Sequence, residues 1–269
     1  ILPITRRIVR IQDGEIVVLR ASGLELYAVA DGARVEREAE EFQGTMDAAV
    51  KGGYPHFMLK EIHEQSQVAR EVLHMLDGSP DVETVIEKMR DARHLYFIGC
   101  GTSYHACLVG AVYFAQLAGR AVIPVLAPQF MPQYAPTVND QDVGLFVSQS
   151  GETKDVLNAL EAAETAGMIA YGLANVIGST LTRATVCALP LCCGYEISVP
   201  ATKTFTNQVI TFLFLATMLR GGGAETLDGL PALMEQAIHW TDPQVRALAE
   251  DINSWNDLYS LGYGSTYAM

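Results

Sequence analysis

A run of polar side chains that directly follows an apolar run has the residue types of an anion site. Residues 144–147 are apolar, which is typical of a buried parallel strand, and Ser148–Thr153 are polar. A helical pattern begins there and ends near Gly167. The first N–H groups of a helix have no partner within the helix, and the helix dipole makes that end positive. The spacing therefore predicts an anion site at the start of this helix.

The residue types in this loop indicate which anion it would bind. Ser148, Ser150 and Thr153 supply hydroxyl donors. Gly151 lets the backbone come close to a ligand, and Lys154 is the one cation nearby. The sequence has no Walker A motif and no G-x-G-x-x-G that opens a helix. We expect a phosphate ester held by neutral donors, while a serine-rich turn that only caps a helix remains an open alternative.

A second turn of similar chemistry lies earlier in the chain, where a strand pattern runs into Gly101–Ser103. Strand and helix patterns alternate from residue 94 onward, which predicts an α/β fold with a doubly wound parallel sheet. Ligands of such sheets bind at the carboxyl ends of the strands. Because both hydroxyl-rich turns follow strands, we favour the phosphate site over the simple cap.

The elements that must position the two turns follow from hydrophobic periodicity and from glycine and proline signals. Strands are expected over residues 95–98, 121–126, 144–147, 170–174 and 186–191, and helices over 58–76, 82–92, 104–117, 128–134, 180–183 and 203–219. The first 38 residues differ, because they alternate in strand fashion between short turn signals. They predict a small antiparallel meander, too thin for a core of its own, with strands over 7–12, 15–20, 24–30 and 33–38. Residues 40–55 are expected to be mostly linker.

Composition excludes several classes of partner. The net charge of −13 argues against nucleic acid and anionic membranes. No apolar run approaches the roughly 20 residues that a membrane helix needs. Five cysteines without a C-x-x-C pair suggest neither a disulfide framework nor a zinc site, so a reduced cytoplasm fits best. His74 and Glu71 have metal-ligand spacing but no further ligands nearby, and we interpret His63 and His74 as packing or surface residues.

The end of the chain carries an internal repeat. Residues 257–267 align with residues 94–104, with Gly262 and Gly264 in the places of Gly99 and Gly101. The repeat indicates the first strand and turn of a second copy of the fold. Because one strand and one turn cannot bury a core, and Ile1 is not a usual start residue, we expect the sequence to be a fragment.

Several motifs together resemble one family. Cys100–His105, Ser148–Thr153 and Val199–Thr206 look like the sugar isomerase (SIS) domain signatures of glutamine–fructose-6-phosphate aminotransferases. Lys51–Gln65 resembles the segment that joins the glutaminase domain of that family to its isomerase half, and Thr5–Glu38 resembles the last glutaminase strands. The resemblance implies a glutaminase tail over residues 1–45, a linker with lead-in helices over 46–93, a first SIS domain of flavodoxin-like fold over 94–222, and a connecting helix with the start of a second SIS domain over 223–269.

The resemblance also implies an activity and a set of ligands. The family converts fructose 6-phosphate and glutamine-derived ammonia into glucosamine 6-phosphate for hexosamine biosynthesis, with no metal and no cofactor. Its isomerase halves pair, so a homodimer is implied. Carried over position by position, the resemblance implies that Ser103, Ser148, Gln149, Ser150 and Thr153 hold the phosphate, and that Thr102 and the backbone at Val199 contact sugar hydroxyls.

The chain departs from the family pattern in three ways. It has no N-terminal cysteine nucleophile, so we expect no glutamine hydrolysis. The catalytic glutamate, histidine and lysine of the family are expected beyond Met269, so the isolated chain should be inactive. Pro200 and Ala201 replace the commoner Ala-Ser, which removes a backbone donor and a hydroxyl. Glu152 has the chemistry of a general base, although we favour a role as partner of a helix N-terminus.

Two alternatives stay open. One is a non-catalytic phosphosugar-binding SIS regulator, although such regulators generally carry a basic DNA-binding domain and none is seen before residue 94. The other is an SIS-type sugar-phosphate deaminase or deglycase, which usually lacks a glutaminase tail.

Overall fold

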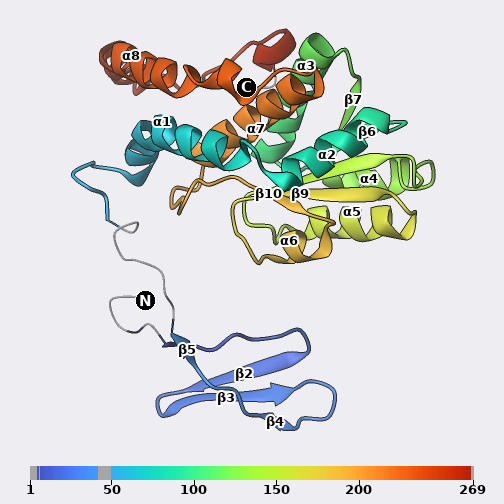
Figure 1. Ribbon diagram of the computed structural model, residues 1–269. Coiled ribbons are helices and arrows are strands. Elements are labelled where there is room, and N and C mark those ends of the chain that lie inside the picture. Colours follow the sequence, from blue (N-terminus) through green and yellow to red (C-terminus); the bar gives the residue numbers. More distant parts are fainter. Residues whose placement is uncertain (1–4, 6, 42–49, 268–269) are drawn as a thin grey trace. The chain divides into compact units, whose positions relative to one another are not determined.

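The computed structural model describes residue 5, residues 7–41 and residues 50–267 of the chain (Figure 1). The chain divides into two compact units, Ile1–Val50 and Lys51–Met269. Within the described part of the chain, no helix is both long and apolar enough to cross a membrane.

The first unit is a thin antiparallel structure, as the sequence predicts. Strands β2 (Glu15–Arg20), β3 (Gly23–Ala28) and β4 (Arg34–Val35) form a three-stranded sheet in that order. Among the described residues of this unit, Leu26 on β3 is the one buried apolar side chain. The unit therefore has almost no core of its own.

The strand predicted over residues 7–12 is wrong in extent and in partner. Only β1 (Arg7–Ile8) forms, and it pairs with β5 (Glu40–Glu41), which lies where a linker was expected. Beyond Ile8, a side chain supplies a hydrogen bond that a neighbouring strand would otherwise supply. Arg37 donates one hydrogen bond to the Arg10 carbonyl (2.5 Å) and forms an ion pair with Glu15 (2.6 Å). The carbonyl of Arg10 is thus satisfied without a neighbouring strand.

The second unit contains a five-stranded, all-parallel sheet with the order β10-β9-β8-β6-β7. Its strands are β6 (Leu95–Gly99), β7 (Val122–Leu126), β8 (Val143–Ser148), β9 (Ile169–Ala174) and β10 (Ala188–Pro190). The chain first passes from β6 to β7 at one edge of the sheet. It then returns to β8 on the other side of β6 and continues through β9 to β10 at the opposite edge. The strand order therefore reverses between the adjacent strands β6 and β8, where α/β sheets bind their ligands. The predicted fold class is confirmed.

Helices cover both faces of this sheet (Figure 1). Phe97 and Leu145 point into one core with α1, α2, α3 and α7, while Ile98 and Phe146 point into a second core with α4 and α5. This alternation along each strand is expected for a sheet that is buried on both faces. The helices are α1 (Phe57–Leu76), α2 (Pro80–Asp91), α3 (Thr102–Ala118), α4 (Ala127–Gln133), α5 (Lys154–Thr165), α6 (Thr180–Ala184), α7 (Lys203–Leu219) and α8 (Leu230–Ile252), with 3-10 turns η2 (Ala224–Leu227) and η3 (Gly264–Tyr267).

The strand predicted within residues 257–267 does not form in this chain. Residues 257–263 have no regular structure, and Leu261 is 98% exposed. One feature of the first copy is nevertheless present, since Gly264 has φ +61° and Gly101 has φ +53°. A strand requires a hydrogen-bonded neighbour, and no described strand pairs with this segment. The repeat thus reproduces this feature of the turn but not the strand.

Candidate functional site

A cavity of ≈ 240 Å³ lies where the two hydroxyl-rich turns meet. Gly99 at the end of β6 pairs in register with Val147 on β8, so the segments that follow these strands emerge side by side. Six of the seven predicted site residues line this cavity, and Ser148 is the exception. The lining residues are Cys100, Thr102, Ser103, Gln149, Ser150, Thr153, Glu196, Ser198, Val199, Ala201, Thr204 and Gln208.

Ser148 is buried and fixes the shape of the loop. Its Oγ accepts a hydrogen bond from the Gly151 N–H (3.0 Å) and lies 2.8 Å from Thr153 Oγ1. The backbone between these residues is held in a tight turn, with Gly151 at φ +68°. A Cβ at Gly151 would lie 2.0 Å from Ser179 Oγ, so only glycine fits without movement. The structure therefore places Ser148 behind the loop, where it orients Thr153.

The loop leads directly into α5, with Thr153 as the residue that precedes its first turn. No side chain in the described part of the chain caps this helix end. Ser150 and Thr153 are half-buried beside it and line the cavity. Backbone N–H groups and hydroxyls therefore face the same space, and both are good partners for a phosphate.

The second turn places the first residues of α3 against the same cavity. The helix begins at Thr102, two residues earlier than periodicity predicts, so that Thr102 and Ser103 lie in its first turn. A Cβ at Gly99 would lie 3.0 Å from the Ser103 backbone, which shows how closely the helix start approaches the strand. Gln208 of α7 donates a hydrogen bond from Nε2 to Ser103 Oγ (3.0 Å). Two helix starts therefore converge on one cavity.

The third wall of the cavity is the loop over residues 194–202, and two carboxylates organise it. Glu61 on α1 is 2% exposed and accepts hydrogen bonds from the backbone N–H groups of Ile197 (2.6 Å) and Ser198 (3.1 Å). Glu196 accepts hydrogen bonds from the N–H groups of Thr202 (2.8 Å) and Thr204 (3.2 Å). The backbone of this wall is thus held firmly even though Val199 at its tip is fully exposed.

Among the described residues, the lining of the cavity contains neutral hydroxyl and amide donors, no lysine or arginine, and one carboxylate, Glu196, which accepts hydrogen bonds from Thr202 and Thr204. Lys203 is buried, and its Nζ is bonded to Glu64 (2.8 Å) and to the Tyr195 carbonyl (2.9 Å). Lys154 is exposed and is not part of the lining. The expectation of neutral donors therefore agrees with the arrangement of these side chains.

Glu152 does not face this cavity. Its Oε1 accepts a hydrogen bond from the N–H of Thr180 (2.8 Å), the first residue of α6. This hydrogen bond holds the pKa of the Glu152 carboxyl below its ordinary value. The carboxylate therefore acts as a partner of a short helix and is not placed as a general base.

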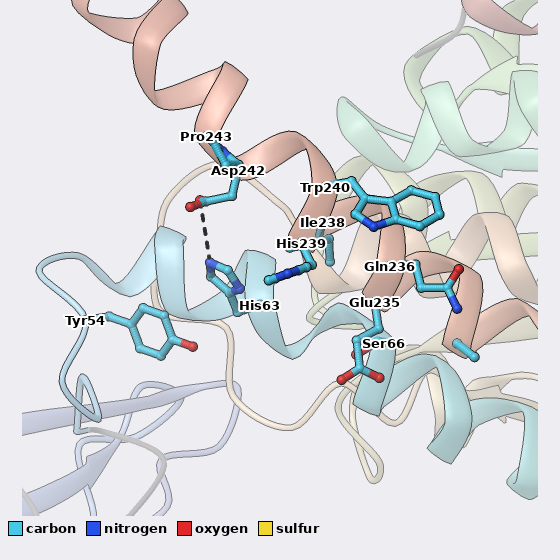
Figure 2. Close-up of a pocket in the computed structure, with 11 residues that line it drawn as sticks. Tyr54, His63, Ser66, Glu235, Gln236, Ile238, His239, Trp240, Asp242 and Pro243 are labelled. Atoms are coloured by element: carbon cyan, nitrogen blue, oxygen red, sulfur yellow. Dashed lines mark ion pairs between the residues drawn. The ribbon is translucent and has the colours of Figure 1, made fainter.

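A larger cavity of ≈ 760 Å³ lies between α1 and α8 (Figure 2). His63 stacks on Tyr54 with ring centroids 5.3 Å apart, and its Nε2 lies 4.0 Å from Asp242 Oδ1. His239 and Trp240 of α8 also line this space. Within residues 5, 7–41 and 50–267, no cluster of three or more histidine, cysteine or acidic side chains could hold a metal ion.

Comparison with known proteins identifies the fold around the small cavity. Residues 88–218 match the SIS domain family, and this range contains both turns and the start of α7. Residues 88–218 therefore form an SIS domain. The sheet, the strand-order reversal and the hydroxyl-rich loops of the chain belong to this domain.

The similarity extends beyond the SIS domain to nearly the whole chain. The glutamine–fructose-6-phosphate aminotransferase (isomerizing) of Methanothermobacter thermautotrophicus is 37% identical over 268 residues, which is 99% of this chain and 44% of the relative. The enzyme of the same name from Aquifex aeolicus is 35% identical over 100% of this chain and 45% of its own length. The resemblance predicted from the motifs is thus confirmed, and the chain spans about half the length of these relatives.

Solved structures agree with this family. The C-terminal domain of glucosamine-fructose-6-phosphate aminotransferase from Francisella tularensis superposes with a TM-score of 0.73 at 26% identity, over 81% of this chain and 65% of that chain. A phosphosugar isomerase, described as putative, from Silicibacter pomeroyi has a TM-score of 0.65 at 26% identity, over 79% of this chain and 64% of its own. A glucosamine-6-phosphate deaminase from Thermotoga maritima, at 22% identity and a TM-score of 0.56, shares the fold.

Three residues that shape this SIS site were not predicted from the sequence. Glu61 lies in a segment that was recognised as family-like, but no role was assigned to it. Glu196 and Gln208 follow no motif of their own. Glu61 has the polar neighbours Lys60 and Glu64, and Gln208 directly follows Asn207, so no local signal singles these residues out or reveals which distant turn they contact.

Proposed function

We propose that the small cavity binds the phosphate group of fructose 6-phosphate and glucosamine 6-phosphate. The chain would then be the sugar-phosphate-binding isomerase portion of a glutamine–fructose-6-phosphate aminotransferase (isomerizing). Ser103, Gln149, Ser150 and Thr153 bind the phosphate, Ser148 holds the loop in shape, and Thr102 and the Val199 backbone contact the sugar hydroxyls.

The observation that carries this proposal is the convergence of neutral donors from two helix starts on one cavity. A phosphate monoester carries between one and two negative charges near neutral pH, and hydroxyls with helix N-termini stabilise such a charge. The reaction of the relatives leaves the phosphate ester intact, so the phosphate needs only to be positioned. A site of neutral donors suits positioning, whereas phosphoryl transfer would call for metal ions or an arginine clamp.

The length of the similarity favours the aminotransferase over the two alternatives. The aminotransferase relatives align with both units of the chain, including the thin antiparallel unit before Lys51. A phosphosugar-binding regulator or a deaminase would be expected to share the SIS domain alone. Release of ammonia from glucosamine 6-phosphate by this chain would instead support the deaminase.

Further properties of the relatives extend to this chain as part of the same proposal. We infer a homodimer in a reducing cytoplasm, ammonia supplied by a glutamine amidotransferase domain, and a second SIS repeat whose first turn is Gly262–Thr266. The catalytic residues would come from that second repeat, so the isolated chain should bind sugar phosphate without converting it. Sedimentation would measure the oligomeric state, and an assay of glucosamine 6-phosphate with added ammonia would measure conversion.

Calorimetric titration tests the binding proposal. Fructose 6-phosphate, fructose and inorganic phosphate are titrated in parallel into the chain, and a thermal melt confirms that the sample is folded. The proposal predicts binding of the phosphosugar, weaker binding of phosphate and no binding of fructose. A folded chain that binds none of the three, or that binds fructose as well as its phosphate ester, would contradict it.

A further inference from the structure

The polar side chain of Gln208 is buried with one of its two polar atoms unsatisfied, and its packing alone does not account for a polar residue there. It lies on α7, is 1% exposed and reaches the wall of the small cavity. Its Oε1 is buried without a hydrogen-bond partner among the described residues. A buried amide oxygen without a partner is destabilising, and an apolar side chain of the same size would avoid that loss.

The hydrogen bond that Gln208 does make joins it to a residue of the candidate site. Its Nε2 donates to Ser103 Oγ over 3.0 Å. A serine hydroxyl has one proton to donate and two lone pairs that accept. When the amide N–H occupies one lone pair, the proton of Ser103 has to point elsewhere. Among the described residues no other hydrogen bond of the Ser103 hydroxyl is found, so its proton is available to a ligand in the cavity.

The neighbouring residue Asn207 is buried to the same extent as Gln208, but its side-chain amide has a clear role in packing. Its Oδ1 also lacks a partner, but its Nδ2 donates to the carbonyls of Val68 (3.0 Å) and Leu191 (2.7 Å). Asn207 therefore links α7 to α1 and to the segment after β10. Gln208 makes no such link in the described structure, and its amide serves only the Ser103 hydroxyl.

We propose that Gln208 is a positioning residue that makes Ser103 a hydrogen-bond donor toward the phosphate. The inference rests on the proposed function of the small cavity and adds to it a residue that orients one donor. Gln208 itself does not touch the phosphate. Its effect on affinity must therefore pass through the Ser103 hydroxyl.

The test is a double-mutant cycle on the affinity for fructose 6-phosphate. Gln208→Met keeps the length of the side chain and removes the N–H donor, so the Ser103 proton is no longer directed. We expect affinity to fall about three- to tenfold, the scale of one hydrogen bond between neutral groups. In a Ser103→Ala background the same substitution should have no effect, because the hydroxyl through which Gln208 acts is gone.

Gln208→Glu supplies a second readout with a specific pH dependence. An ionised carboxylate would accept the Ser103 proton and add a negative charge beside the phosphate, so the loss should exceed that of Gln208→Met at pH 8. Lowering the pH protonates the carboxyl and restores a donor. The affinity of Gln208→Glu should therefore approach that of the wild type as pH falls, while the ratio for Gln208→Met stays constant.

Thr211→Val is the matched control, because Thr211 lies one turn along α7, is fully buried, and its hydroxyl bonds among the described residues only to the Asn207 carbonyl (2.7 Å). It should lower the melting temperature without changing affinity. Equal affinity of Gln208→Met and the wild type, or an equal loss in both Ser103 backgrounds, would overturn the inference and leave the proposed function standing. A folded wild type that binds no phosphosugar would overturn both.

Discussion

Two cavities of the second unit differ in size and in chemistry, and the smaller of these is the better candidate site. The cavity between α1 and α8 measures ≈ 760 Å³ and is lined by ionisable and aromatic side chains such as His63, Asp242 and Trp240 (Figure 2). The cavity at the carboxyl ends of β6 and β8 measures ≈ 240 Å³ and is lined mainly by hydroxyl and amide groups. Size alone would choose the wrong cavity for a sugar phosphate.

The difference follows from how each cavity is built. The small cavity lies at the carboxyl ends of two adjacent parallel strands, where two helix starts and a carboxylate-braced loop meet. The large cavity lies between two helices and away from the sheet, with Asp242 already paired with Arg246 (2.7 Å). A fixed arrangement of donors, rather than volume, makes the small cavity suitable for an anion.

Placing a negative charge in the small cavity should have the largest effect. Ser150→Asp brings a carboxylate next to the expected phosphate position, and repulsion between like charges should lower the affinity for fructose 6-phosphate by about 100-fold or more. Gln236→Glu adds the same charge to the lining of the large cavity and should leave affinity unchanged. Calorimetry on both variants measures the difference. A stronger loss from Gln236→Glu would mean that the two cavities have been assigned the wrong way round.

The rigid loop of the small cavity predicts a loss of stability at Gly151. An added Cβ meets Ser179 Oγ at 2.0 Å, and the backbone has φ +68°. Gly151→Ala should therefore lower the free energy of unfolding by about 2–4 kcal/mol, from strain and overpacking together. Gly178→Ala is the control, because Gly178 has φ +82° but nothing within 4 Å of an added Cβ. It should lower the free energy of unfolding by only about 1–2 kcal/mol. Urea denaturation that gives equal losses would show that the loop is not tightly packed.

Removing single hydroxyls should give a smaller effect that is confined to one cavity. Thr153→Val or Ser150→Ala should weaken sugar-phosphate binding by about 1–3 kcal/mol, the scale of a lost hydrogen bond to a charged group. His63→Ala removes a side chain from the large cavity and should change affinity by less than about 0.3 kcal/mol. Unchanged affinity in both hydroxyl variants would indicate that neither hydroxyl contacts the phosphate.

The dependence of unfolding free energy on acid pH should differ between variants of two aspartates, Asp142 before β8 and Asp242 in the large cavity. Asp142 precedes β8 and has no exposed side-chain surface. Burial alone would raise its pKa, but hydrogen bonds from Arg93, the Asn139 N–H and His94 outweigh burial and hold the pKa below its ordinary value. A depressed pKa stabilises the folded state above the unfolded value of about 4, and this stability is lost as the pH falls through the folded pKa.

Asp142→Asn should therefore flatten the acid side of the curve of unfolding free energy against pH. Asp242 in the large cavity also has a pKa below its ordinary value, mainly through its hydrogen bond with Arg246, but this pair is exposed. Asp242→Asn should change the curve little, because exposed ion pairs contribute little to stability. Equal changes in the two variants would contradict this distinction.

The fold and most of the candidate site could be predicted because their signals are local. Alternating apolar runs and glycine turns predicted the five parallel strands, and hydroxyls next to strand ends pointed to Thr102, Ser103, Ser150 and Thr153. Gln149 and the Val199 backbone were added by the family resemblance. Gln208 and Glu61 could not be predicted, since their partners Ser103 and Ile197 lie 105 and 136 positions away in the sequence. Contacts at such separations depend on how helices pack, which no short pattern records.

The repeat over residues 257–267 also shows that a local pattern does not determine contacts with distant parts of the chain. Gly264 has a positive φ, as Gly101 has, so this feature of the turn is present without a neighbouring strand. The strand expected before it does not form, because strand formation depends on neighbours that a local pattern cannot supply. Sequence reasoning was therefore accurate for this local feature of the backbone and wrong where pairing decides the conformation.

A crystal structure of the chain with fructose 6-phosphate tests the central claim most directly, because it shows which cavity the ligand occupies. We predict the phosphate in the small cavity, with its oxygens about 2.6–3.0 Å from the hydroxyls of Ser103, Ser150 and Thr153. The larger cavity beside His63 should hold no ligand. Phosphosugar bound between α1 and α8, with the small cavity empty at saturating ligand, would contradict the account.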